Sequence, residues 1–390
     1  TEIYTLSLHD ALPIWLRAAE FDGAIVSPGF AVRHPWLEYL RAQDIPMVPE
    51  FEWGARHYPD SRIIAVTGTN GKSSLVKWVA DTLVRAGYRA EPCGNYGVPP
   101  CALAAEGREL DVLVLELSSF QLEQAVSFRP DIGILLNLTP NHLDRHADFD
   151  EYVRAKSRLF AGMEDASSMI IHAPAWPLVA RWLPGIQNPR LFGEGGACEI
   201  VFRDGVIHRS GREPVDLRGT MWGVRPWGVN AAAGVAALDA MEIPAETTQA
   251  AAAAFSGLPH RLEELPPWRG IRFINDSKAS TLAAMAAAVA SSPHKKHLIA
   301  GGILKESDLS FVKELLAKNC AFVYCIGTVA QKLVQAWGDV VPCLDCGDMA
   351  TAVQAAMSRM KRDEVLLLSP GCSSFDQFAS YGERGNVFKN

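Results

Sequence analysis

Several marks of common protein classes are missing from this 390-residue chain. There is no sustained basic run, and the formal net charge is −7, which argues against nucleic-acid binding. No apolar run approaches the roughly 18–20 residues that cross a bilayer, so we expect no membrane insertion. The 8 cysteines are scattered, and the CxxC pair Cys343 and Cys346 has no second pair beside it. We therefore expect reduced thiols and a cytoplasmic protein.

The N-terminal segment also lacks the signals of a secreted protein. Residues Thr1–Ile14 have neither an initiator methionine nor a basic region ahead of an apolar core. We predict that this segment is not native to the protein and assign it no function. The full chain is 48% hydrophobic and 21% charged, and it is long enough for two or three globular domains.

Apolar strand-like runs alternate with helical patterns along most of the chain, which is typical of an α/β fold. The runs LDVLVLELSS and PDIGILLNLTP are nearly continuous, as expected for central strands covered on both faces. A Gly-Leu-Pro break at 257–259 follows an alanine-rich helix and indicates a domain boundary. We predict domains over 51–257 and 258–390, and a region 15–50 too small for a core of its own.

The segment AVTGTNGKSS, Ala65–Ser74, has most parts of a phosphate-binding loop but fails its usual spacing. The pattern G-x-x-x-x-G-K-[ST] requires a glycine where Val66 stands, and Gly68 comes two residues later. Between a predicted strand and helix, the segment still offers glycines, Lys72 for outer phosphates and the Ser73 hydroxyl for Mg²⁺. We interpret it as a nucleotide site; the alternative is a Gly/Asn turn with a chance Lys-Ser pair.

Two further residues, Glu116 and His142, are candidates for metal chemistry from their positions after strands. Glu116 closes a strand and is placed to hold Mg²⁺ directly or through water, although it could equally be a surface carboxylate. His142 follows another strand, but a single histidine is more often structural than a ligand. Lys156 has the pattern of an ordinary exposed helix lysine, and the residues alone give no reason to prefer it to Lys77.

Three polar loops in the last third of the chain each follow a predicted strand: Asn275–Thr281, 301–308 and 369–385. In open α/β sheets, ligands bind beyond the carboxyl ends of the strands. We therefore predict that these loops converge on one site. The alternative is three unrelated loops that only cap helices.

With these motifs in view, the chain resembles the Mur ligases of bacterial cell-wall synthesis, which are ATP-dependent amide-bond-forming enzymes with three α/β domains. The short GTNGKSS loop is the family's own version of the phosphate loop, which accounts for the failed spacing. The resemblance, from about Asp22 to Asn390, is closest to the branch that joins D-glutamate to UDP-N-acetylmuramoyl-L-alanine. It is carried by ELSSFQLE, NLTPNHLDRH, GLPHRLE, NDSKAST and LLSPGCSSFDQF.

The resemblance implies an architecture and a set of partners. Region 15–50 would be the remnant of a truncated Rossmann-like UDP-binding domain. The P-loop ATPase-like domain 51–257 would bind ATP, and the Rossmann-like domain 258–390 would bind the amino acid. The enzyme would act as a monomer on UDP-N-acetylmuramoyl-L-alanine and D-glutamate through an acyl phosphate, with no nucleic-acid partner.

The resemblance also assigns residues, and Lys72, His142 and Lys156 would be catalytic. The ATP site would comprise Gly68, Thr69, Asn70, Gly71, Lys72, Ser73, Ser74, Asn230, Arg261 and Asp276. Two Mg²⁺ ions would be held by Ser73, Glu116, His142 and Lys156, the lysine as a carbamate. The nucleotide-sugar substrate would contact Ser27, Pro28, Gly29, Asn95, Ser118, Ser119 and Gln121. D-Glutamate would contact Lys278, Ser280, Lys305, Ser374, Phe375 and Tyr381.

The chain departs from the family in two places. Shortly before Asn230 it reads RPWGVN, where the family usually carries His-Asn, and the first half of the N-terminal domain has no counterpart. Three alternatives follow. These are a sibling ligase such as a folylpolyglutamate synthase, a simple P-loop phosphohydrolase or kinase, and a truncated fragment that binds ATP without catalysis.

Overall fold

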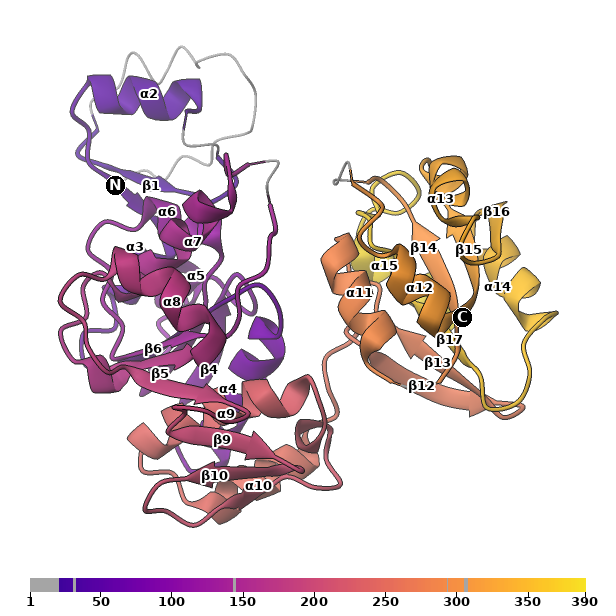
Figure 1. Cartoon of the computed structure of the whole chain (residues 1–390). Helices are drawn as coiled ribbons and strands as arrows, with labels where there is room; N and C mark the ends of the chain where they lie inside the picture. Colours follow the sequence, from indigo (N-terminus) through magenta and orange to yellow (C-terminus); the bar gives the residue numbers. More distant parts are fainter. Residues whose placement is uncertain (1–20, 31–32, 143–144, 293, 305–307) are drawn as a thin grey trace. The chain divides into compact units, whose positions relative to one another are not determined.

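The computed structural model describes residues 21–30, 33–142, 145–292, 294–304 and 308–390 (Figure 1). The segment Thr1–Ile14, predicted to be non-native, lies outside these ranges. The chain divides into two compact units. The first consists of the chain up to Leu138 together with Asp150–Phe255, and the second of Thr139–Phe149 together with Ser256–Asn390.

The N-terminal part of the first unit is a small two-stranded parallel sheet with a helix between its strands. Strand β1 (Ala24–Val26) pairs with β2 (Met47–Pro49), and α2 (Pro35–Ala42) connects them. Trp36, 2% exposed, packs with neighbouring apolar side chains into a separate small cluster. Among the described residues of this part, two strands and one helix bury only this small cluster.

A nine-stranded sheet forms the centre of the first unit, in the order β11-β10-β9-β8-β7-β6-β3-β5-β4. Strands β3 to β9 pair in parallel, and β10 and β11 complete the sheet in antiparallel pairs. The strands are β3 (Arg62–Thr67), β4 (Ala90–Gly94), β5 (Val112–Glu116), β6 (Ile132–Leu135), β7 (Met169–His172), β8 (Arg190–Gly193), β9 (Ile200–Arg203), β10 (Val206–Arg209) and β11 (Val215–Asp216).

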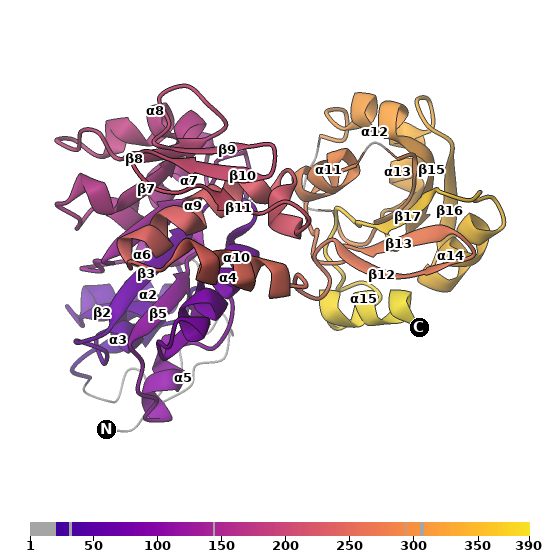
Figure 2. The ribbon, with the colours of Figure 1, turned by 90° about the horizontal axis from the view of Figure 1, so that it is seen from below.

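Helices cover this sheet, and α4 and α9 pack against each other and against its strands (Figure 2). Their contact is close because Gly234 of α9 has no side chain: a Cβ there would lie 2.8 Å from Trp78. Trp78 stacks on Trp222 with the ring centroids 4.5 Å apart. The helices are α3 (Glu50–Ala55), α4 (Lys72–Arg85), α5 (Pro100–Ala105), α6 (Ser119–Gln124), α7 (Phe149–Ser157), α8 (Trp176–Val179), α9 (Trp227–Ala240) and α10 (Ala245–Ala254).

The second unit contains a six-stranded sheet in the order β12-β13-β17-β14-β15-β16, parallel except for the β12–β13 hairpin. Each face of the sheet has its own apolar cluster, one including side chains of α11, α12 and α13 and the other side chains of α14 and α15. The strands are β12 (Glu263–Trp268), β13 (Ile271–Asn275), β14 (Lys296–Gly301), β15 (Cys320–Ile326), β16 (Cys343–Gly347) and β17 (Val365–Leu368). The helices are α11 (Leu282–Ala290), α12 (Lys313–Asn319), α13 (Ala330–Trp337), α14 (Met349–Met357) and α15 (Tyr381–Lys389).

The predicted α/β fold class is confirmed: mainly parallel sheets covered by helices make up both units. Central strands such as β5 are buried along their whole length, which explains their unbroken apolar sequence. Across the described ranges, no helix combines the length and the apolar character of a membrane span.

Candidate functional site

The predicted phosphate loop lies between β3 and α4, and its two glycines adopt conformations that a larger residue would strain. Gly68 has φ of 143° and Gly71, the N-cap of α4, has φ of 86°. A Cβ on Gly71 would lie 2.1 Å from Nδ2 of Asn230, and one on Gly68 would lie 3.0 Å from Leu136. The loop is therefore packed from α9 on one side and from the segment after β6 on the other.

The backbone of the loop is fixed by a residue that the sequence did not single out. The Asn137 carboxamide accepts from Asn70 N at 2.8 Å and donates to Asn70 O at 3.0 Å. Thr69 N donates to the Asn137 carbonyl at 2.8 Å, and the Thr69 hydroxyl lies 3.0 Å from Tyr152 OH. Asn137 is the polar residue that ends the apolar run of β6, and this was the one signal for its role.

Lys72 opens α4 and folds back over the loop. Its ammonium donates to the carbonyls of Gly68 and Thr69, at 2.8 and 2.9 Å. The N-terminal amides of the 14-residue α4 lie at the same loop. Amides and an ammonium at a helix N-terminus are the arrangement that binds phosphate groups.

Beside the loop, the Glu116 carboxylate at the end of β5 accepts two hydrogen bonds. The Ser73 hydroxyl donates to one carboxylate oxygen, and Asn95 Nδ2 donates to the other at 2.7 Å. Glu116 is 2% exposed and Ser73 is 1% exposed. A serine hydroxyl and a carboxylate are hard oxygen donors that suit Mg²⁺, an ion that keeps several waters and phosphate oxygens as its other ligands. The residues present therefore fit the predicted ion.

The expectation that Lys156 is an ordinary exposed helix lysine is wrong, because its side chain is 2% exposed. Its ammonium donates to the Thr67 hydroxyl at 3.2 Å, and that hydroxyl in turn donates to the Leu117 carbonyl. Burial lowers the pKa of Lys156 well below its usual range; the nearby Lys72 lowers it further, and Glu116 opposes them. The helix α7 thus directs an amine toward the same strand ends as the loop.

His142 is the fourth predicted metal residue, and it belongs to the segment Thr139–Phe149, which groups with the second unit. Its backbone has φ of 56°, and its carbonyl accepts from Arg145 N at 3.0 Å and His146 N at 2.9 Å. It lies seven residues after Leu135, where β6 ends, and its metal role stays a prediction. Among the described residues, no group of three or more His, Cys, Asp or Glu side chains gathers around a cation site.

Three of the residues predicted to bind the nucleotide sugar, Ser118, Ser119 and Gln121, lie at the start of α6. Ser118 and Gln121 form a capping box: the Ser118 hydroxyl accepts from Gln121 N at 3.2 Å, and Gln121 Oε1 accepts from Ser118 N at 2.9 Å. Ser119, next in the helix, is 2% exposed. In the N-terminal part, the Ser27 hydroxyl accepts from Gly29 N at 3.4 Å, so Ser27–Gly29 forms a local turn after β1.

In the second unit, the loop after β13 carries Asp276, Lys278 and Ser280. Burial raises the pKa of the Asp276 carboxyl to about 7. Hydrogen bonds from the Ser369 hydroxyl at 2.8 Å and from Leu262 N at 3.1 Å favour the carboxylate and lower this pKa, but burial has the larger effect. The charge of the nearby Arg261 also lowers this pKa.

The other residues of the predicted amino-acid pocket vary in exposure. The Lys278 ammonium lies 4.0 Å from the centroid of the Tyr381 ring. Ser374 is 3% exposed, whereas Phe375 is 72% exposed and Tyr381 is 39% exposed. Lys305 lies outside the described residues, so its predicted role has no structural counterpart here.

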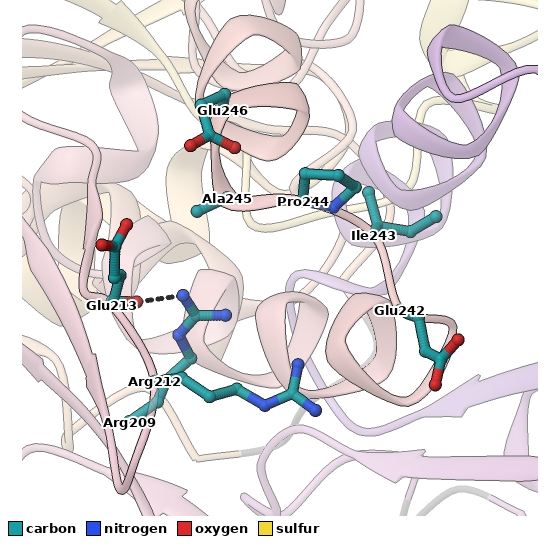
Figure 3. Close-up of a pocket in the computed structure, with 8 residues that line it drawn as sticks. All are labelled: Arg209, Arg212, Glu213, Glu242, Ile243, Pro244, Ala245 and Glu246. Carbon is teal, nitrogen blue, oxygen red and sulfur yellow. Dashed lines mark hydrogen bonds between the residues drawn. The ribbon is translucent and has the colours of Figure 1, made fainter.

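A cavity of about 420 Å³ lies elsewhere in the first unit, between the end of β10 and the connection from α9 to α10 (Figure 3). Its arginines are already engaged: Arg209 bonds Asp239 and the Glu213 carbonyl, and Arg212 lies 3.5 Å from Asp239. None of the predicted site residues is among those that line it: Arg209, Arg212, Glu213, Glu242, Ile243, Pro244, Ala245 and Glu246.

Known proteins are similar to this chain in both sequence and fold. A family model for the Mur ligase middle domain matches residues 66–187. The UDP-N-acetylmuramoylalanine--D-glutamate ligase of Acidobacterium capsulatum is 35% identical over 95% of this chain and 82% of its own length. The protein of that name from Nitratidesulfovibrio vulgaris gives the same three values.

Among solved structures, the MurF ligase of Thermotoga maritima in complex with ADP superposes with a TM-score of 0.65 at 14% identity, covering 94% of each chain. The FolC protein of E. coli with DHPP and ADP gives a TM-score of 0.65 at 18% identity, covering 93% of this chain and 98% of FolC. These two likenesses show the fold. Because the sequence relatives extend over most of both chains, the protein belongs to the Mur ligase family, in the branch of the UDP-N-acetylmuramoylalanine–D-glutamate ligases.

Proposed function

We propose that this chain is an ATP-dependent ligase that joins D-glutamate to UDP-N-acetylmuramoyl-L-alanine in cell-wall precursor synthesis. The observation that carries the proposal is the 35% identity to D-glutamate ligases over 95% of the chain. The sibling reading, a folylpolyglutamate synthase, has support from the FolC fold alone, at 18% identity. The reaction would take place in the cytoplasm, and the enzyme would work as a monomer.

The reaction has to activate a carboxylate, because a carboxylate does not react with an amine in water. The L-alanine carboxylate attacks the γ-phosphoryl group of ATP, the bond to ADP breaks, and an acyl phosphate forms. The neutral amine of D-glutamate then attacks the acyl carbon, and inorganic phosphate leaves. The loop amides and Lys72 hold the phosphates and offset the charge that accumulates on them.

Ser73 and Glu116 would hold one Mg²⁺, with Asn95 fixing the carboxylate from its other oxygen. Bound there, the ion would neutralise phosphate charge. His142 and Lys156 would hold a second ion, the lysine as a carbamate. The buried amine of Lys156, whose pKa burial lowers well below its usual range, supports this chemistry, because a neutral amine attacks CO₂, forms an N–C bond and loses a proton.

The remaining assignments divide between the two units. Asn230, beside Gly71, would contact ATP from α9, and Arg261 and Asp276 would contact it from the second unit. Ser27–Gly29, Asn95 and the start of α6 would face the nucleotide sugar. D-Glutamate would bind at Lys278, Ser280, Lys305, Ser374, Phe375 and Tyr381, where the lysine ammoniums suit a dicarboxylate.

The decisive experiment is phosphate release from ATP in the presence of UDP-N-acetylmuramoyl-L-alanine, measured against a panel of amino acids. Release that depends on D-glutamate is the expected result. Release without any acceptor would instead indicate a phosphohydrolase, and release with a folate acceptor and L-glutamate would indicate the sibling ligase. ATP binding with no turnover would indicate a non-catalytic fragment.

A further inference from the structure

One buried cation connects the three loops that were predicted to form the amino-acid pocket. Arg384 lies in α15 and is 1% exposed. Its Nε donates to the Ser277 hydroxyl at 3.0 Å, and Nη2 donates to the Ser277 carbonyl at 2.7 Å. Its Nη1 donates to the Cys372 carbonyl at 3.0 Å and to the Gly301 carbonyl at 3.5 Å. The guanidinium therefore reaches the ends of β13, β14 and β17 at once.

Each of these partners is close in sequence to a predicted pocket residue. Ser277 precedes Lys278, and Cys372 lies two residues before Ser374. Gly301 ends β14, the strand before the loop that leads to Lys305. The Ser277 hydroxyl, which accepts from Arg384, itself donates to the Tyr381 carbonyl at 2.7 Å. Arg384 is thus one hydrogen bond away from several segments that carry side chains for the amino acid.

The same three loops also hydrogen-bond to one another through their backbones. Gly371 N donates to the Ala279 carbonyl, Gly301 N to the Pro370 carbonyl and Ile303 N to the Ser373 carbonyl, each at 2.9 Å. The approach is close: a Cβ on Gly302 would lie 2.1 Å from the Ser373 carbonyl and 3.3 Å from Arg384 Nη1. These amides offer a direct measure of whether the loops stay together.

The electrostatics of Arg384 indicate a role beyond an ordinary ion pair. Burial lowers its pKa to about 10, with Cys372 and Asp376 opposing the shift, so the side chain keeps its charge at neutral pH. Within the described part of the chain, its hydrogen-bond acceptors are three carbonyls and a hydroxyl rather than a carboxylate. Hydrogen bonds from a charged donor are stronger than neutral ones, and a planar guanidinium directs several of them in fixed directions.

We propose that Arg384 is a positioning residue that holds the loops after β13, β14 and β17 in register, and thereby sets the spacing of Lys278 and Ser374 for the amino-acid substrate. The proposal rests on the proposed function, because that function identifies the ligand. Arg384 acts through the loops and does not itself touch the substrate. A shift of about 1 Å in such groups can cost roughly a hundredfold in rate.

The test compares the full-length wild type with Arg384→Met and Arg384→Lys. In Arg384→Met we expect the KM for D-glutamate to rise roughly tenfold or more, while the KM for ATP rises less, because Asp276 is a proposed ATP contact next to Ser277. Arg384→Lys keeps the positive charge but lacks the planar guanidinium with its several N–H donors, so its KM for D-glutamate should rise less than that of Arg384→Met. A matched control is Lys389→Met, which removes an ion pair to Glu263 from the exposed face of the same helix and should leave both constants unchanged.

Amide hydrogen exchange provides a readout that does not depend on turnover. Peptides covering 276–281, 301–304 and 371–376 should exchange faster in Arg384→Met, while β15 and residues 296–300 of β14 keep their protection. Unchanged loop exchange in a folded variant would overturn the proposal, as would equal increases in the two KM values. If Arg384→Met does not fold, the same criteria apply to Arg384→Lys. A wild type without D-glutamate dependence would instead contradict the proposed function, whatever the exchange shows.

Discussion

At the scale of single residues, Lys156 offers the sharpest test because its buried amine contacts the Thr67 hydroxyl at 3.2 Å and lies 4.8 Å from the centroid of the Tyr152 ring. Replacing it with methionine keeps the volume and removes a buried amine, so we expect the melting temperature to hold or rise. Ligation should fall about a hundredfold or more, since the predicted carbamate is lost. Phosphate release and a thermal melt measure the two effects. Lys77→Met, on an exposed pair with Asp81, is the control; full turnover in Lys156→Met would exclude the carbamate.

Asp276 predicts a pH dependence. Its pKa is raised to about 7 in the folded protein, so between the ordinary value and 7 the folded state holds a proton that the unfolded state releases. The stabilisation from this group is therefore present at low pH and is lost as pH rises through 7. Asp276→Asn keeps the shape and removes the titration. The melting temperature of the variant minus that of the wild type should therefore rise by about 5 °C from roughly pH 5 to pH 8. A constant difference across that range would contradict the raised pKa.

At the scale of elements, the β3–α4 turn needs glycine for two separate reasons, and a matched pair of variants separates them. Gly71 combines a φ of 86° with the contact to Asn230, whereas Gly87, just after α4, has a φ of 96° and open space around it. Gly87→Ala should cost about 1–2 kcal/mol from backbone strain alone. Gly71→Ala should cost more and should also weaken ATP binding by tenfold or more. Calorimetric titration with ATP measures this; equal ATP affinity in the two variants would refute a close role for Asn230.

The ends of β4 and β5 predict the metal requirement. Chelation of Mg²⁺ should abolish phosphate release. Glu116→Gln keeps the size of the side chain but weakens both the ligand and the bond from Ser73, so the Mg²⁺ concentration for half-maximal rate should rise about tenfold. The control is Glu106→Gln. Glu106 follows the last residue of α5, its side chain is 58% exposed, and the variant should need the same Mg²⁺ concentration as the wild type. An unchanged Mg²⁺ requirement in Glu116→Gln would show that Glu116 is not a ligand of the ion.

At the scale of the whole molecule, the sequence predicted the α/β class because strand and helix periodicities are local properties. The phosphate loop was also readable, since its glycines, lysine and serine are consecutive. Lys156, Asn137 and Arg384 were not readable from the residues alone. Their roles come from burial and from partners far along the chain, as with Arg384 and Ser277 or Lys156 and Thr67. A pattern of neighbouring residues contains no information about such contacts, and for Lys156 the resemblance to a family supplied what the pattern did not.

The two units also predict how the whole chain unfolds. Their apolar clusters are made of separate residues, so calorimetry should resolve two transitions, and the pH-sensitive one, identified with Asp276→Asn, belongs to the second unit. A non-hydrolysable ATP analogue with Mg²⁺ should stabilise the first unit by about 2.7 kcal/mol at a hundred times its Kd. If Arg261 and Asp276 contact the nucleotide as proposed, the second transition should rise as well, and Arg261→Ala should confine the shift to the first. A wild-type shift confined to the first transition would remove both residues from the proposed ATP site.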